Sequence, residues 1–271
     1  MNQILLDSIR AAIEAGKIVN EIYHTPFEII TKSDNTPVTL ADTLSSKKII
    51  QLLSHHNIPI ISEEENVFSE EEMNKIDTFF VIDPLDGTRE FIKRNGEFTI
   101  NIALIENKEP VLGIVYAPAK DLLYFGMKHF GSYKIEGNDL KKITLHSEFT
   151  LEDILEYSDK LPIYNLPNVY TIITSRSHLD EKTVDYIDQQ RKEHGLIEYI
   201  RMGSSLKMCL LAEGKAHEYP RFGRTMEWDT AAAHIILKEA GGNILDSRYL
   251  QPLEYHKKHF ENPDFIAYAV Y

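Results

Sequence analysis

Apolar side chains recur at intervals of three or four positions over the first 23 residues of the chain. This spacing places them on one face of a helix. We therefore predict an amphipathic helix from Asn2 to about Tyr23 that packs against a core. The residues that share the face are Leu5, Ile9, Ala12, Ile13, Gly16, Val19 and Tyr23.

A second helix is expected over about 43–56, and an apolar strand follows at 58–61. His55 and His56 end this helix, and we expect them to be structural or solvated. Alternating and apolar runs separated by turn residues then predict an antiparallel meander. Its strands are expected at Phe98–Glu106, Pro110–Tyr116, Leu122–Met127 and Ser132–Ile135.

From about Phe149 the pattern changes to alternating strands and helices, which is typical of layered α/β packing. We expect two closely packed subdomains, at 1–148 and 149–271, in an α+β or α/β chain. The strands are predicted at 169–174, 197–202, 216–219, 243–245 and 265–270. The helices are predicted at 181–192, 204–213 and from Asp229 to a stop at Gly241.

Composition excludes several classes of protein. Acids outnumber bases 42 to 29 in the 271 residues, a formal charge of −13, so a broad nucleic-acid-binding surface is not expected. Cys209 is the only cysteine, which leaves no intrachain disulfide and no cysteine cluster for zinc. The sequence has neither a signal peptide nor a stretch of about 20 apolar residues, so a cytoplasmic protein is expected.

The most informative chemistry lies in Asp83-Pro84-Leu85-Asp86-Gly87-Thr88, which follows the apolar run 78–82. Pro84 has no N–H, so we expect strand pairing to stop there, and Gly87 permits backbone geometry that a side chain would block. The two carboxylates and the Leu85 carbonyl can then face one cleft, as hard divalent cations require. The alternative is an ordinary turn in which aspartates cap backbone N–H groups.

Three other segments carry acids that either bind a cation or serve only the local structure. Asp229 follows Trp228 and is a good N-cap for its helix. Glu63 begins a run of three acids after a strand, and such runs are usually solvated. Asp42 ends the loop that begins at Lys32 and precedes the second helix, which it would cap.

Together these segments resemble the magnesium-dependent, lithium-sensitive phosphatases, a superfamily that includes inositol monophosphatases, fructose bisphosphatases and 3′(2′),5′-bisphosphate nucleotidases. An apolar strand followed by D-P-x-D-G-T and an aromatic residue is met at Phe80 to Phe91, and W-D-x-A-A at Trp228 to Ala232. The resemblance is strongest to the CysQ-type nucleotidases. The stretches that carry it are Lys32–Asp42, Thr88–Thr99, Gly203–Lys207 and Tyr219–Gly223.

The resemblance implies an α/β/α/β/α sandwich that hydrolyses the 3′-phosphate of adenosine 3′,5′-bisphosphate to AMP and phosphate, a step linked to sulfate assimilation. It implies two or three Mg²⁺ ions, inhibition by Li⁺, and water oriented by Asp42 and Thr88. The implied metal ligands are Glu63, Asp83, the Leu85 carbonyl, Asp86 and Asp229. The implied substrate contacts are Gly87, Thr88, His178, Ser204, Lys207, Arg221 and Asp229.

Several interpretations stay open at this point. Thr88 and His178 could be turn or capping residues, and Arg221 could form a surface ion pair. Arg89, Lys93 and Arg94 could form a surface hairpin edge, and we leave them out of the site. The substrate could instead be an inositol monophosphate, a sugar bisphosphate or a phosphorylated dinucleotide, or the chain could be a non-catalytic sensor of phosphonucleotides. We expect a monomer or homodimer that binds a small nucleotide. We expect a cytoplasmic protein, and peripheral attachment to the inner face of the membrane stays open.

Overall fold

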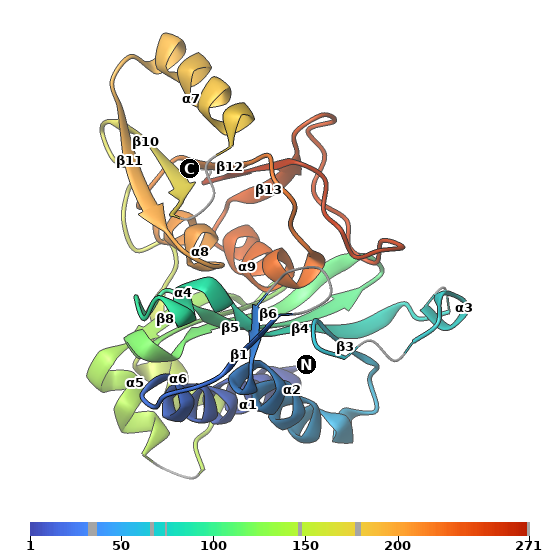
Figure 1. The fold of residues 1–271 in the computed structure, drawn as a ribbon. Coiled ribbons are helices and arrows are strands. Elements are labelled where there is room, and N and C mark those ends of the chain that lie inside the picture. The colour runs from blue at the N-terminus through green and yellow to red at the C-terminus, as the bar shows by residue number, and fades with distance from the viewer. Residues whose placement is uncertain (32–36, 66–67, 74, 146–147, 177–179, 270–271) are drawn as a thin grey trace.

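The computed structural model describes residues 1–31, 37–65, 68–73, 75–145, 148–176 and 180–269. Its elements form five layers: helices, a seven-stranded sheet, two helices, a five-stranded sheet, and a final helix (Figure 1). The predicted α/β/α/β/α sandwich is therefore confirmed.

The first layer covers one face of the seven-stranded sheet. Helix α1 follows the predicted spacing, and its apolar face is buried in the same core as the inward residues of the sheet. Hydrophobic burial on this face holds the layer to the sheet. The helices of this layer are α1 (Asn2–Tyr23), α2 (Leu40–Leu53), α5 (Gly137–Thr144) and α6 (Leu151–Glu156).

The seven strands are hydrogen-bonded in sequence order from β3 to β9. Only the β3–β4 pair of this sheet is parallel, and the predicted antiparallel meander follows it. The strands are β3 (Ile60–Ser62), β4 (Thr78–Asp86), β5 (Thr99–Glu106), β6 (Glu109–Ala117), β7 (Leu122–Met127), β8 (Gly131–Glu136) and β9 (Asp159–Lys160).

The central layer consists of α8 (Leu206–Glu213) and α9 (Glu227–Glu239) between the two sheets. Small residues let α9 approach the seven-stranded sheet closely. A Cβ on Gly113 of β6 would lie 2.3 Å from the Ala232 carbonyl oxygen, and the alanines of the first turns are buried. This close packing places the N-terminal end of α9 next to β4 and β5.

The five-stranded sheet has the order β11-β10-β12-β14-β13. Its outer face is covered by α7 (Glu181–His194) through a small cluster of isoleucines (Figure 1). The strands are β10 (Tyr170–Ser175), β11 (Ile197–Met202), β12 (Glu218–Arg221), β13 (Asn243–Asp246) and β14 (Phe265–Tyr268).

Short elements complete the described part of the chain. A two-stranded ribbon precedes α2, and α4 begins immediately after the Asp83 to Gly87 segment. These elements are β1 (Ile29–Thr31), β2 (Pro37–Thr39), η1 (Ser54–His56), α3 (Glu70–Met73), α4 (Thr88–Ile92) and η2 (Pro118–Lys120).

Two predicted helix starts were wrong, for the same reason. Thr39 is the N-cap of α2, and Asp42 sits three residues inside the helix as the acid of a capping box. Helix α9 likewise begins at Glu227, and Asp229 accepts from the Met226 N–H at 2.8 Å. A carboxylate at the third helical position accepts a hydrogen bond from the N–H of the residue that precedes the helix. The same carboxylate can then also face a cleft.

Pro84 does not end strand β4, contrary to the prediction. The strand runs to Asp86 with a bulge between Asp83 and Asp86, after which Asp86 pairs again with Thr99. A bulge leaves residues unpaired within a strand and changes where their side chains point. Ser45 of α2 donates to the Pro84 carbonyl at 2.8 Å and fixes the bulge against the first helical layer.

The division into 1–148 and 149–271 stays a prediction. Strand β9 pairs with β8, and α6 packs in the core of the first layer, so the seven-stranded sheet includes residues from both sides of that boundary. Within the described residues, no helix is long and apolar enough to cross a membrane.

Candidate active site

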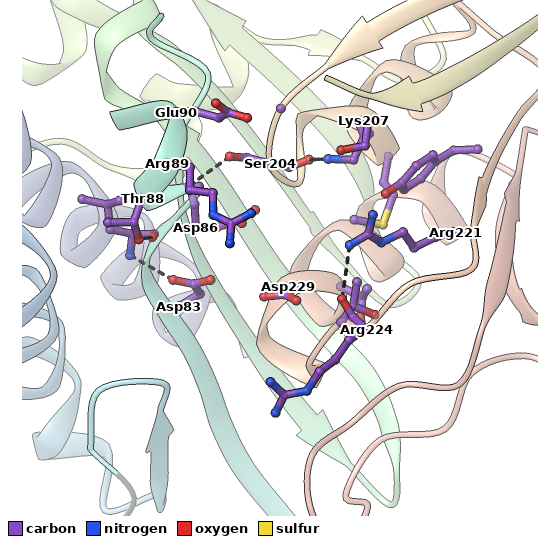
Figure 2. A pocket seen from close by; sticks show the side chains of 18 of the residues that line it. Asp83, Asp86, Thr88, Arg89, Glu90, Ser204, Lys207, Arg221, Arg224 and Asp229 are labelled. Atoms are coloured by element: carbon purple, nitrogen blue, oxygen red, sulfur yellow. Dashed lines mark hydrogen bonds between the residues drawn. The ribbon is translucent and has the colours of Figure 1, made fainter. Parts of the chain in front are cut away.

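Three aspartates converge at the bulge of β4 and the first turn of α9. One carboxylate oxygen from each of Asp83, Asp86 and Asp229 lies within 4.8 Å of the others. The bulge aims the first two, and the capping position aims the third, into one pocket between the two sheets (Figure 2). The sequence-based grouping of these acids is thus reproduced in space.

The acids lie close enough to disturb one another. Burial raises the pKa of Asp83 well above its usual range, and the neighbouring charges of Glu63, Asp86 and Asp229 raise it further. Burial, together with Asp86, raises the pKa of Asp229 to about 8. Carboxylates held together at this cost need a counter-charge, either protons or cations.

Glu63 follows β3 and lines the same pocket. Its N–H donates to the Ile82 carbonyl at 3.2 Å, which continues the pairing of β3 with β4 to the edge of the acid cluster. Leu85 also lines the pocket, and its carbonyl oxygen lies 3.4 Å from the Thr88 hydroxyl oxygen. All five predicted metal ligands therefore border one space.

Asp42 of α2 and Thr88 of α4 are joined by a hydrogen bond between their side chains. The Thr88 hydroxyl lies 3.3 Å from Asp42 Oδ1, and the other carboxylate oxygen accepts from the Thr39 N–H and hydroxyl, each at 2.7 Å. Burial raises the pKa of Asp42 above its usual range, against the lowering effect of Thr39. A carboxylate with a raised pKa is a better proton acceptor near neutral pH.

Gly87 is required by its backbone geometry. Its φ of +87° is unfavourable for a residue with a Cβ, and a Cβ there would lie 2.2 Å from Ser204 Oγ. The Ser204 hydroxyl donates to the Glu97 carbonyl at 2.6 Å and lies 2.9 Å from the Asp86 carbonyl. Ser204 lines the pocket, but its side chain also ties the loop before α8 to the end of β4.

Sequence reasoning missed Ser205, which holds Asp86 in place. Its N–H and hydroxyl donate to Asp86 Oδ2 at 2.7 and 3.1 Å, and its hydroxyl lies 2.6 Å from the Asp229 carbonyl. Ser205 therefore connects two of the converging acids. Only its position beside Ser204 at a helix start could have suggested this.

Glu97 was also missed. It is buried, accepts two bonds from the Arg176 guanidinium at 2.7 Å each, and accepts from the Gly203 N–H at 2.8 Å. A buried carboxylate that accepts several charge-assisted hydrogen bonds is held in one position. Glu97 thus holds together the end of β10 and the loop before α8, which line the pocket at Ser175 and Gly203.

Lys207 and Arg221 lie on the opposite side of the pocket from Asp83 and Thr88 (Figure 2). Burial lowers the pKa of Lys207 to about 8, and the nearby charge of Arg221 adds to this. The Lys207 ammonium donates to the Ser204 carbonyl at 2.6 Å. Arg221 Nε is shielded from solvent and has no hydrogen-bond partner among the described residues.

Two further arginines line the pocket, although the sequence pattern did not include them. Arg89 is the second residue of α4, after Thr88, and Arg224 follows β12 (Figure 2). Arg89 is exposed, as predicted, but it lies on helix α4 rather than on a hairpin edge, and it borders the pocket. His178 lies outside the described residues, so its predicted substrate contact stays a prediction.

The comparisons with known proteins agree with this geometry. The sequence pattern that defines the inositol monophosphatase family matches residues 1–261, and the chain belongs to this family. The chain is 38% identical over 267 residues to the 3′(2′),5′-bisphosphate nucleotidase CysQ of Escherichia coli strain K12, covering 96% of this chain and 98% of that protein. Identity to the CysQ of Haemophilus influenzae is 33%, covering 98% and 91%.

Solved structures give the same assignment of fold. The crystal structure of CysQ from Bacteroides thetaiotaomicron superposes with a TM-score of 0.90 at 41% identity, covering 99% of this chain and 98% of that one. The extragenic suppressor protein suhB from Bartonella henselae superposes with a TM-score of 0.69 at 20% identity, which supports the fold alone. Of these proteins, those at 33–41% identity are CysQ proteins.

The residues of the pocket fit a divalent metal. The pocket offers three carboxylates within 4.8 Å of one another and is also lined by Glu63, and carboxylate oxygens are the ligand type that hard cations bind. The mutual repulsion that raises the pKa of Asp83 and Asp229 would be relieved by a cation among them. Family membership and the acid cluster together indicate a metal-dependent protein.

The acid cluster predicts a pH-dependent effect of metal on stability. Asp229 has a pKa near 8 in the fold against an ordinary 3.8, so protonation stabilises the metal-free fold, and this contribution is lost as pH rises through 8. To bind, Mg²⁺ must displace protons from the acid cluster at pH 6, and it displaces fewer of them at pH 8. We expect Mg²⁺ to raise Tm by about 5 °C more at pH 8 than at pH 6.

Thermal unfolding with Mg²⁺ and with chelator at both pH values measures this difference. Asp229→Asn provides the matched control, because it removes the carboxyl with the raised pKa and should flatten the pH dependence. A Mg²⁺ effect of equal size at both pH values, in both proteins, would show that the acids do not exchange protons for metal.

Proposed function

We propose that this chain is a 3′(2′),5′-bisphosphate nucleotidase that hydrolyses the 3′-phosphate of adenosine 3′,5′-bisphosphate to AMP and phosphate. One observation carries the proposal: one pocket holds three converging carboxylates and, across it from Asp83, the cations Lys207 and Arg221. A substrate with two phosphates fits such an arrangement, one at each side. The names of the CysQ relatives support the same substrate class.

We assign the metal site to Glu63, Asp83, the Leu85 carbonyl, Asp86 and Asp229, and the metal to Mg²⁺, two or three ions per site, with Li⁺ as an inhibitor. When bound by these residues, such ions would lower the pKa of water and neutralise charge on the phosphate and the leaving oxygen. Oxygen ligands shared among several acids match the preference of Mg²⁺, which retains water and substrate oxygens in its shell.

Asp42 and Thr88 would orient the attacking water. The Thr88 hydroxyl donates its proton to Asp42, so the hydroxyl oxygen is left to accept a hydrogen bond from a water in the pocket. A proton leaving that water can then pass through Thr88 to Asp42, whose buried carboxylate has a raised pKa. The first-turn N–H groups of α4, after Gly87, are suited to hold oxygens of the reacting phosphate.

The second phosphate would lie between Lys207 and Arg221. These cations disfavour each other, since the charge of Arg221 helps to lower the pKa of Lys207, and an anion between them reverses that effect. Arg221 Nε has no described partner although it is shielded from water, which leaves a donor for a phosphate oxygen. Ser204 and His178 stay assigned to the nucleotide as predictions.

The deciding experiment measures phosphate release in Mg²⁺ from adenosine 3′,5′-bisphosphate and from inositol 1-phosphate. We expect a much higher kcat/KM for the bisphosphate. Arg221→Ala should lower kcat/KM for the bisphosphate by about 10²-fold, the value of a charge-assisted contact, and leave inositol 1-phosphate nearly unchanged.

Arg191→Ala is the matched control, because Arg191 is an exposed arginine that pairs with Asp188 on α7. A preference of the wild type for inositol 1-phosphate would refute the nucleotidase proposal. An equal loss for both substrates in Arg221→Ala would refute only the role of Arg221. No phosphate release from any ester would favour the phosphonucleotide sensor. Cytoplasmic location, peripheral membrane attachment and a monomeric or dimeric state stay predictions.

A further inference from the structure

A second group of possible metal ligands lies where the start of α1 meets the end of α2. Asp7 belongs to α1, and His55 and His56 form the short helix η1 that continues α2. One ligand atom from each lies within 4.8 Å of the others. Helices α1 and α2 lie side by side beneath the seven-stranded sheet (Figure 1).

The Nε2 atoms of both imidazoles point toward one carboxylate oxygen of Asp7. Nε2 of His55 lies 3.3 Å from Asp7 Oδ2, and Nε2 of His56 lies 3.2 Å from the same atom. The two rings pack against each other with centroids 4.0 Å apart. Ligand atoms about 2.0 Å from a tetrahedral zinc ion are separated by about 3.3 Å, so both spacings equal the edge of a zinc coordination shell.

The surrounding hydrogen bonds prepare the ligand atoms. Nδ1 of His55 lies 2.9 Å from the Leu52 carbonyl, which only accepts, so Nδ1 carries a proton and Nε2 is the ring nitrogen left to bind a metal. Metal-bound histidines usually have this outer bond. Gln3 donates to Asp7 Oδ1 at 2.9 Å and Arg10 lies 3.7 Å from it, so Oδ2 is turned to the histidines.

His56 provides an independent sign that the cluster lacks a component. Its Nε2 is shielded from solvent and makes no hydrogen bond to any described residue, despite lying 3.2 Å from a carboxylate oxygen. Buried polar atoms without a partner are uncommon in folded proteins. A metal ion on the lone pair would satisfy this nitrogen, and the exposed side of His55 leaves room for a water as fourth ligand.

We propose that Asp7, His55 and His56 form a structural Zn²⁺ site that joins the start of α1 to the end of α2. Two imidazoles and one carboxylate suit zinc, whereas Mg²⁺ prefers an octahedron of oxygens, so the site and the catalytic acids select different metals. Helix α2 has 14 residues, about 21 Å, and carries Asp42 in its first turn. The zinc site thus anchors the C-terminal end of α2, far from Asp42 in its first turn.

The test uses the whole protein dialysed against Zn²⁺ in excess Mg²⁺, with bound zinc and Tm measured. The variants are Asp7→Asn, His55→Gln and the double variant His55→Gln/His56→Gln, and the matched control is His259→Gln, at an exposed histidine. Wild type and control should retain one more zinc ion per chain than the variants. Zinc should raise their Tm by about 5 °C.

Cobalt gives a second readout, since four-coordinate Co²⁺ absorbs strongly in the visible region. This band should appear in wild type and be absent in the double variant, while Mg²⁺-dependent phosphate release is similar in both. Equal zinc content and equal Tm shifts in all proteins would overturn the site. His55 is largely exposed, so His55→Gln decides the question even if Asp7→Asn fails to fold. A Tm that follows pH but not zinc would assign the cluster to protonated histidines instead.

Discussion

Replacing Asp86 with Asn is expected to lower kcat for phosphate release by at least about 10³-fold, while the fold survives. Asp86 lies at the centre of the acid cluster, in charge interactions with both Asp83 and Asp229. An amide keeps the side-chain shape and can still accept from the Ser205 N–H, which lies 2.7 Å from Oδ2 of the aspartate. It removes the negative charge that a hard cation requires.

The same substitution should raise the stability of the metal-free protein. Asp86 raises the pKa of both Asp83 and Asp229, so deleting its charge removes repulsion from the folded state. We therefore expect a higher Tm in chelator and a smaller increase on adding Mg²⁺. Asp139→Asn, which alters an exposed ion pair with Lys142, should change neither quantity. Activity like that of wild type in Asp86→Asn would remove this residue from the metal site.

The sequence predicted what depends on local patterns. The meander from β5 to β8 follows from alternating apolar positions, and its predicted bounds differ from the structure by one residue at most. The grouping of Asp83, Asp86 and Asp229 required the order of motifs, because Asp229 lies in a distant part of the chain from the other two acids. Chemistry alone could not choose between cation binding and capping, and the Asp229 carboxylate both accepts a capping bond and faces the acid cluster.

The contacts that hold the site together could not be predicted from the sequence. Ser205 reaches Asp86 across 119 positions, and Glu97 pairs with Arg176 across 79. No periodicity or local motif encodes contacts over such separations. The bulge in β4 was missed because proline normally ends strand pairing, whereas here the chain pairs again at Asp86 after the interruption. Tertiary contacts, such as Ser45 with the Pro84 carbonyl, fix this local exception.

Asp42→Asn and Thr88→Ala should each lower kcat by about 10² to 10⁴-fold with little change in KM, because both act on the attacking water. The amide in Asp42→Asn keeps an oxygen for the Thr39 N–H of the capping box but presents an N–H donor toward Thr88. The Thr88 hydroxyl then turns to the Leu85 carbonyl, and the path to Asp42 is broken. Since each change breaks the same relay, the double variant should lose about as much as the worse single one.

Thr88→Ser is the matched control, because it retains the hydroxyl that lies 3.3 Å from Asp42 Oδ1 and should keep most of the activity. Steady-state phosphate release for the three single variants and the double variant completes the cycle, with circular dichroism to verify folding. If the double variant loses the full product of the two single effects, Asp42 and Thr88 act independently. The shared proton path from water through Thr88 to Asp42 would then be wrong, and each residue would act on the reaction by a separate route.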